Sequence, residues 1–183
     1  MRKRLNSIGA ILVVTFLSIF SQSALAQFCE QKYFSCKTGG KEISLCGADL
    51  GDSFNIMFNI GKETVAEFTH GEKLAVTEYS TGKMTLTSIH FKSKDSVYAI
   101  TTCEGMECNP DKDAWLSVVK GKKRVKGSGV CEAGTSTGFT NLPFVMDKKG
   151  NRTLDKKNFL AEYFSVNKNP KDFFLTENIG WSE

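Results

Sequence analysis

Six cysteines constrain this chain more than any other feature of its 183 residues, because all six follow an N-terminal segment typical of export. A chain that enters an oxidising compartment with an even number of cysteines is expected to pair them as disulfides. Six cysteines allow 15 pairings, and sequence alone does not choose among them. The candidates for up to three disulfides are Cys29, Cys36, Cys46, Cys103, Cys108 and Cys131.

A structural metal site is the alternative use of these cysteines. Zinc sites favour Cys pairs separated by two residues, or Cys together with His. The closest pair, Cys103 and Cys108, has four residues between its members, and His70 and His90 lie far from any cysteine. The spacing therefore favours disulfides, and we expect no metal and no cofactor.

Residues 1–26 are typical of a secretory signal peptide. Three basic residues at positions 2–4 precede an apolar run from Ile8 to Phe20, and Ala24-Leu25-Ala26 offers the small residues of a cleavage site. A membrane anchor is the alternative, but the run is short for a bilayer span, and no later segment is long enough. We expect a mature chain of residues 27–183 that forms a single secreted domain, periplasmic or released from the cell.

Loss of the signal peptide changes the charge of the chain. Its three basic residues reduce the 24 Lys and Arg to 21, against 20 Asp and Glu, so the net charge falls from +4 to +1. A mature chain this close to neutral lacks the overall positive charge expected of a nucleic-acid-binding protein. Hydrophobic residues at 40% and charged residues at 24% are ordinary for a globular protein.

Short apolar segments separated by turn residues predict an all-β fold. Phe54–Ile60 alternates apolar and polar residues with the period of two that a half-buried strand requires. Gly39-Gly40 is a natural turn for a hairpin, and a turn centred there places Cys36 opposite Ile43 rather than Cys46. Further strands are expected at Thr64–Phe68, Leu74–Tyr79, Met84–Lys92, Val97–Thr102, Trp115–Val119 and Arg124–Cys131. This spacing predicts an antiparallel β-sandwich or barrel of about eight strands, stabilised by disulfides.

The chain after Gly138 is less regular. Phe159, Leu160, Tyr163 and Phe164 follow a helical spacing, so Asn158–Val166 is expected as a short helix or a strand. We therefore predict a partly helical C-terminal segment, with Phe173–Leu175 as a candidate closing strand.

No arrangement of residues in the sequence indicates catalysis. There is no phosphate-binding glycine loop, and a cysteine held in a disulfide is not a nucleophile. Carboxylates could form an acid–base pair, although solvated strand faces explain them equally well. The candidates for such a pair are Glu63, Glu67, Glu72 and Glu78.

One cluster of positive charge is a candidate binding patch. It consists of Lys120, Lys122, Lys123, Arg124 and Lys126, five charges within seven residues of a predicted hairpin. An anionic partner is one interpretation. A solvated hairpin tip that discourages edge-to-edge strand pairing is the commoner explanation.

Two patches of the sequence resemble a group of small uncharacterised exported bacterial proteins. The first is Phe34-Ser35-Cys36 followed by Gly40-Lys41-Glu42-Ile43-Ser44-Leu45-Cys46, which is similar to an F-x-C opening, a Gly-Lys turn and an I-x-L-C strand. The second is an apolar strand at Trp115–Val119, the turn Gly121-Lys122, and a strand that ends in Cys131. The resemblance implies a periplasmic β-rich domain and assigns no catalytic or binding residue.

The sequence leaves two classes of function open. The first is a non-enzymatic exported domain that binds an unknown protein or envelope component through loops on a β-scaffold. A periplasmic lysozyme inhibitor would be one such protein, but the Ser-Gly-x-x-Tyr loop of those inhibitors is absent, since Ser128-Gly129 is followed by Val130-Cys131-Glu132. The second class is a hydrolase that uses carboxylates in an open cleft.

Overall fold

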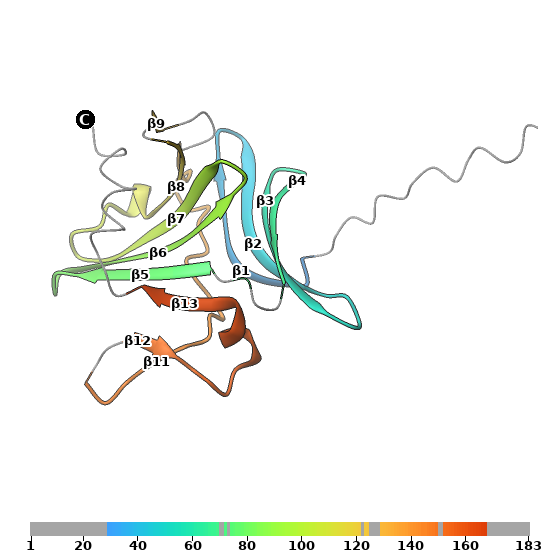
Figure 1. Cartoon of the computed structure of the whole chain (residues 1–183). Coiled ribbons are helices and arrows are strands. Elements are labelled where there is room, and N and C mark those ends of the chain that lie inside the picture. Colours follow the sequence, from blue (N-terminus) through green and yellow to red (C-terminus); the bar gives the residue numbers. More distant parts are fainter. Residues whose placement is uncertain are drawn as a thin grey trace, which may run out of the picture.

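A computed structural model describes residues 29–69, 72, 74–121, 123–124, 129–149 and 152–167 (Figure 1). The predicted signal peptide, His70 and the candidate strand Phe173–Leu175 lie outside the described residues. Within these ranges the chain is an all-β protein with thirteen strands. The first eight contain six or more residues each, and the last five are short.

The first half of the chain forms a four-stranded antiparallel sheet in the order β1-β2-β3-β4. The expected Gly39-Gly40 turn is confirmed, since both glycines have positive φ, at 55° and 73°. The expected register is also confirmed, since Cys36 pairs with Ile43. The four strands are β1 (Gln31–Thr38), β2 (Lys41–Asp49), β3 (Phe54–Ile60) and β4 (Glu63–Phe68).

The second half forms a seven-stranded sheet in the order β10-β8-β7-β6-β5-β13, with β9 also paired to β8. All of these strands pair antiparallel except β13, which runs parallel to β5. Its long strands are β5 (Leu74–Ser80), β6 (Met84–Ser93), β7 (Ser96–Gly105) and β8 (Ala114–Lys120); the short ones are β9 (Lys123–Arg124), β10 (Gly129–Val130) and β13 (Phe164–Asn167).

Four small elements of the described chain lie outside the two large sheets: the strands β11 and β12 and the 3-10 turns η1 and η2. A hairpin of β11 (Phe144–Met146) and β12 (Arg152–Leu154) lies beside β13 (Figure 1), and η1 (Pro110–Lys112) follows β7. Within the described part of the chain, no helix has the length and hydropathy needed to cross a membrane.

The prediction of a partly helical C-terminal segment is not supported. Helical structure in the described part of this segment is limited to the 3-10 turn η2 (Phe159–Tyr163), which begins where the Asn158 side chain accepts a hydrogen bond from the Leu160 backbone N–H at 3.0 Å. The chain then becomes strand β13, in which Phe164 pairs with Leu74 of β5. Pairing with a free sheet edge and burial of Phe164 outweigh the weak helical spacing of the sequence.

The two large sheets contribute to one hydrophobic core. Phe58 of β3 is fully buried, with its ring centroid 5.0 Å from that of Phe91 in β6 and 5.6 Å from that of Tyr98 in β7. Such edge-to-face and tilted aromatic contacts contribute beyond simple burial. The aromatic cluster therefore joins the four-stranded sheet to the seven-stranded one.

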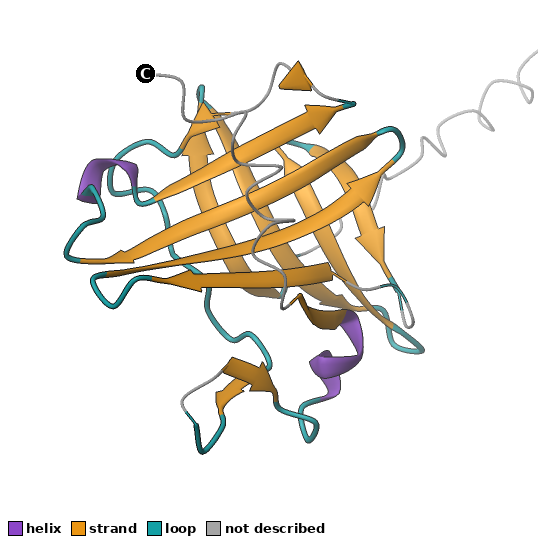
Figure 2. Ribbon diagram, turned by 60° about the vertical axis from the view of Figure 1, so that its left-hand side comes forward, coloured by secondary structure: helices purple, strands orange, loops and turns teal. Residues whose placement is uncertain are grey.

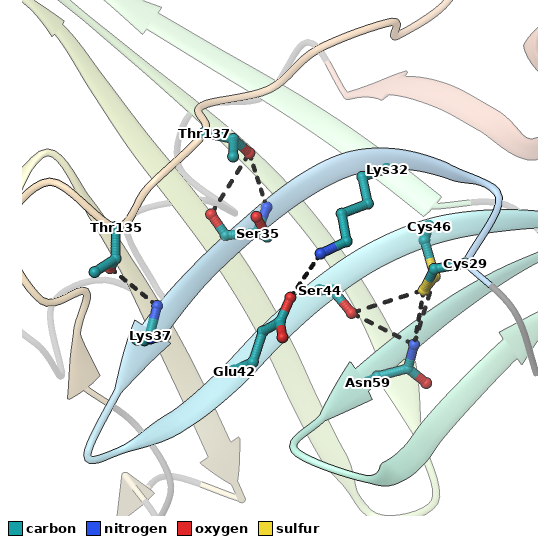
Figure 3. Close-up of polar contacts among 10 residues, drawn as sticks. All are labelled: Cys29, Lys32, Ser35, Lys37, Glu42, Ser44, Cys46, Asn59, Thr135 and Thr137. Carbon is teal, nitrogen blue, oxygen red and sulfur yellow. Dashed lines mark hydrogen bonds and ion pairs between the residues drawn. A yellow bond between two sulfur atoms is a disulfide. The ribbon is translucent and has the colours of Figure 1, made fainter. Parts of the chain in front are cut away.

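The segment after β10 covers the outer edge of β1. The backbone N–H groups of Glu132, Thr137 and Thr140 donate to carbonyl oxygens of β1 at 2.7–2.9 Å. Side-chain hydroxyls of Thr135 and Thr137 accept from backbone N–H groups of the same strand (Figure 3). These bonds satisfy backbone groups that an exposed edge strand would leave open to another chain.

All six cysteines are paired, so the predicted disulfides are confirmed. The pairs are Cys29–Cys46, Cys36–Cys131 and Cys103–Cys108. Cys36–Cys131 fastens β1 to the edge segment just described. Beside Cys29–Cys46, the Asn59 side-chain amide lies 3.5 Å from each sulfur (Figure 3).

The buried phenol of Tyr33 predicts a loss of stability in alkali. Burial raises the pKa of Tyr33 above its ordinary value, with a smaller contribution from Tyr163. Above about pH 10 the unfolded chain releases this proton while the folded chain retains it, so the free energy of unfolding falls by up to about 1.4 kcal/mol per pH unit. Urea unfolding between pH 8 and pH 11 should show this fall, and Tyr33→Phe should reduce it. Equal slopes for the two proteins would contradict the assignment.

Candidate functional site

The predicted basic patch is only partly described. Lys120 pairs with Asp95, and this ion pair lowers the pKa of Asp95, chiefly through the hydrogen bond from Lys120. Lys123 and Arg124 form strand β9, paired with the end of β8. Lys122 and Lys126 lie outside the described residues. The anion-binding role of this patch therefore stays a prediction.

The structure does not bring the candidate carboxylates together. Glu63 and Glu67 lie on β4 of the four-stranded sheet, whereas Glu78 lies on β5 of the other sheet. Glu72 accepts a hydrogen bond from the Thr69 backbone N–H at 3.2 Å. A role for any two of these carboxylates as an acid–base pair stays a prediction.

Among the described residues, no group of three or more His, Cys, Asp or Glu side chains is placed to hold a metal ion. His90 is half-buried on β6, on the opposite side of that strand from the core residues Ile89 and Phe91.

A pocket of about 240 Å³, lined by both polar and apolar groups, lies at the β11–β12 hairpin. Phe139 anchors one side, since its ring centroid lies 5.3 Å from that of the buried Phe34. Phe144 anchors the other, since its ring contacts Phe164 edge-on at 5.9 Å. The pocket is lined by Phe139, Asn141, Leu142, Phe144, Val145, Met146 and Arg152. Two of its aromatic side chains are therefore packed against core residues.

The rim of the pocket is unusually apolar. Met146 is 63% exposed and Val145 is also exposed, although both belong to a strand. Large apolar side chains that gather beside a pocket mark binding surfaces more often than isolated ones do. The arrangement is suited to receiving an apolar group from a ligand or partner.

The polar side of the pocket comes from Arg152. Its Nε lies 2.7 Å from a carboxylate oxygen of Glu78 on β5, and its guanidinium carbon lies 6.0 Å from the centre of the Phe144 ring. The ion pair neutralises the charge of Arg152, so the pocket does not present a free cation. Arg152 can still donate hydrogen bonds from its other nitrogens, which favours a neutral ligand group with a polar atom.

Arg152→Ala should loosen the hairpin without unfolding the protein. The variant loses a half-exposed ion pair and a weak cation–π contact, so the free energy of unfolding should fall by about 1 kcal/mol or less. Hydrogen exchange of the β11 amides should nevertheless accelerate clearly. Lys83→Ala is the control, because it removes the exposed Lys83–Glu107 pair at 3.3 Å, far from β11 in sequence. Equal exchange rates of the β11 amides in wild type, Arg152→Ala and Lys83→Ala would show that Arg152 does not hold the hairpin.

Sequence reasoning did not find this pocket. The signal was the short apolar run Phe144-Val145-Met146, followed by Lys148-Lys149-Gly150 and then Arg152-Thr153-Leu154, a pattern compatible with a small hairpin. Comparison with protein-family models, with curated proteins and with solved structures found no match for the chain.

Proposed function

We propose that this protein is an exported, non-enzymatic binding domain of the bacterial envelope, a disulfide-stabilised β-sandwich that is periplasmic or secreted. Two observations support the compartment. The first 26 residues have the composition of a signal peptide. The three intramolecular disulfides are compatible with an oxidising location outside the cytosol.

The pocket at the β11–β12 hairpin carries the proposal. Its walls are fixed by Phe34 and Phe164 of the core, and its rim exposes Val145 and Met146 to water. A pocket whose aromatic side chains are already packed against the core loses little entropy when a partner binds. The ligand we propose is an apolar side chain of a partner protein or envelope component, inserted between Phe139 and Phe144.

Comparative capture tests this proposal. Mature wild-type protein, Met146→Glu and Met106→Glu are immobilised, and each is incubated with an envelope extract before mass spectrometry. Met106 is the matched control, because it is an exposed methionine on the Cys103–Cys108 loop instead of the hairpin. We expect wild type and Met106→Glu to retain the same partner and Met146→Glu to lose it. A partner retained equally by all three proteins would contradict a site at the hairpin.

The same preparation distinguishes binding from hydrolysis. A binding domain should keep its partner when Glu63, Glu67 and Glu72 are each replaced by alanine. A hydrolase would instead lose turnover of an envelope substrate at one of these positions. Such a loss would overturn the non-enzymatic proposal.

A further inference from the structure

The β11–β12 hairpin and the turn η2 lie at the same end of the molecule. Figures 1 and 2 show both elements beside the edge of the large sheets, with the hairpin projecting away from the long strands. Strands β11 and β12 form a two-stranded sheet of their own, so no third described strand pairs with the hairpin. The hairpin can therefore reach a flat surface that the long strands do not touch.

Half of the large apolar side chains that are exposed in the described chain lie at this end. Val145 is 45% exposed, Met146 63% and Phe159 59%. Apolar side chains that gather on one projecting end mark a contact surface more often than scattered ones do. The remaining exposed apolar residues belong to three separate segments and are Leu50, Met106 and Val130.

Exposed lysines flank these apolar side chains in two pairs. One pair follows Met146 after a single intervening residue, and the other precedes Phe159 with the same spacing. Among the described residues, none of these four lysines forms an ion pair. The lysines are Lys148, Lys149, Lys156 and Lys157, and together with Val145, Met146 and Phe159 they are named the hairpin patch here.

The two acidic residues of this segment do not cancel its charge. Asp147 accepts a hydrogen bond from the Lys149 backbone N–H at 2.8 Å, and Asp155 accepts one from the Lys157 backbone N–H at 3.0 Å. Both carboxylates are therefore directed at the backbone of their own turns. Residues 144–159 contain five basic and two acidic residues, a net charge of +3, whereas the expected mature chain carries only +1. The positive charge of the chain is thus concentrated beside its exposed apolar residues.

We propose that the hairpin patch docks onto an anionic lipid surface. This inference rests on the function proposed above, because it names the envelope component that the hairpin contacts. Val145 and Met146 enter the boundary between headgroups and acyl chains, and the lysines contact the lipid phosphates.

The kind of basic residue favours a lipid surface over a protein partner. Protein interfaces are enriched in Arg and depleted in Lys. Lysine clusters, by contrast, attract anionic headgroups without needing a fixed geometry, because each ammonium is a point charge on a flexible stem. All four free cations of the hairpin patch are lysines, and Arg152, which lies between the two pairs in the sequence, is engaged by Glu78.

Co-sedimentation of the mature protein with lipid vesicles tests the proposal. Wild type should bind vesicles of phosphatidylglycerol mixed equally with phosphatidylethanolamine, and it should bind pure phosphatidylcholine vesicles at least tenfold more weakly, because these carry no net charge. Added salt should weaken the binding to the anionic vesicles, because it screens exposed charges. No binding to the anionic vesicles, or equal binding to both kinds, would overturn the proposal.

Charge variants test whether the lysines of the hairpin patch carry the attraction. Replacing Lys148 and Lys149 together by glutamine should weaken binding to the anionic vesicles roughly tenfold. The matched control replaces Lys37 and Lys41 by glutamine, which removes two exposed lysines beside the first hairpin turn and changes the net charge equally. Its binding should stay within about twofold of wild type. Equal losses in the two variants would refute a local site at the hairpin.

A neutral substitution tests the apolar contact separately. Met146→Gln keeps the charge and removes an exposed apolar group from the rim, so binding to the anionic vesicles should fall roughly fivefold. Met106→Gln is the control, because Met106 is even more exposed, at 87%, but lies on the Cys103–Cys108 loop. Both positions are exposed, so both variants should fold as wild type. Unchanged binding by Met146→Gln would overturn the insertion of β11 into the lipid surface.

The capture experiment described above separates failure of this inference from failure of the proposed function. A protein retained by wild type and lost by Met146→Glu, without binding of wild type to anionic vesicles, would overturn the lipid surface and leave the hairpin as a protein-binding site. Absence of both kinds of binding would overturn both proposals.

Discussion

Replacing Cys36 and Cys131 together by alanine is expected to lower the free energy of unfolding by about 4–5 kcal/mol. The disulfide closes a loop with a sequence separation of 95, the longest of the three, so it restricts the unfolded chain most. Both cysteines are also buried, and their removal leaves space beside the core. The loss approaches the whole stability of an ordinary domain. Urea unfolding of the oxidised proteins at 25 °C measures it.

Cys103→Ala with Cys108→Ala is the control for this experiment. That disulfide spans a separation of only 5, and neither cysteine is fully buried. Its removal should cost roughly 2 kcal/mol on the same loop-entropy argument. A control that is destabilised as much as the Cys36/Cys131 variant would refute the view that this long link holds β1 to the segment after β10.

Phe58→Ala should lower the free energy of unfolding by about 3–5 kcal/mol. Phe58 is fully buried, and its ring contacts Phe91 and Tyr98 from the opposite sheet. Truncation leaves a cavity where the two sheets meet, and neighbouring strands cannot collapse far enough to fill it. Thermal and urea unfolding measure the loss.

Phe159→Ala is the matched control for Phe58→Ala. Phe159 is 59% exposed and contacts Phe54 edge-on at 5.1 Å, so its truncation should cost about 1 kcal/mol or less. If the two phenylalanine variants lose equal stability, Phe58 does not form the junction between the sheets.

The strands were predictable because their signals are local. Phe54–Ile60 alternates as a half-buried strand must, and it is β3 with the predicted bounds. Gly39-Gly40 fixed the register of the first hairpin, and that register explains why Cys36 does not pair with Cys46. Turn preferences and period-two alternation depend on residues that are close together in the chain, so both can be recognised from the sequence alone.

The disulfide pairing and the C-terminal elements were not predictable, because they depend on distant contacts. Cys36 pairs with Cys131 at a sequence separation of 95, so only the tertiary fold brings the two together. Phe159 and Phe164 suggested a helix, but Phe164 entered a parallel strand because the edge of β5 was available to pair with it. Local spacing is a weak signal when a tertiary contact offers both hydrogen bonds and burial.

The pocket could not be foreseen for a related reason. Its lining comes from Phe139, from residues 141–142 and 144–146, and from Arg152, and Glu78 on a distant strand neutralises the charge of Arg152. In the sequence, Phe139 and Phe144 look the same as any core phenylalanine. Only the fold shows that both line one pocket together with the exposed Met146.

Peptide mapping of the mature protein under non-reducing conditions tests the central claim most directly, namely that three disulfides hold a β-sheet domain together outside the cytosol. We predict an N-terminus at Gln27 and three linked peptide pairs, which join Cys29 to Cys46, Cys36 to Cys131 and Cys103 to Cys108. Free thiols at these positions, or a Cys36–Cys46 link, would contradict it.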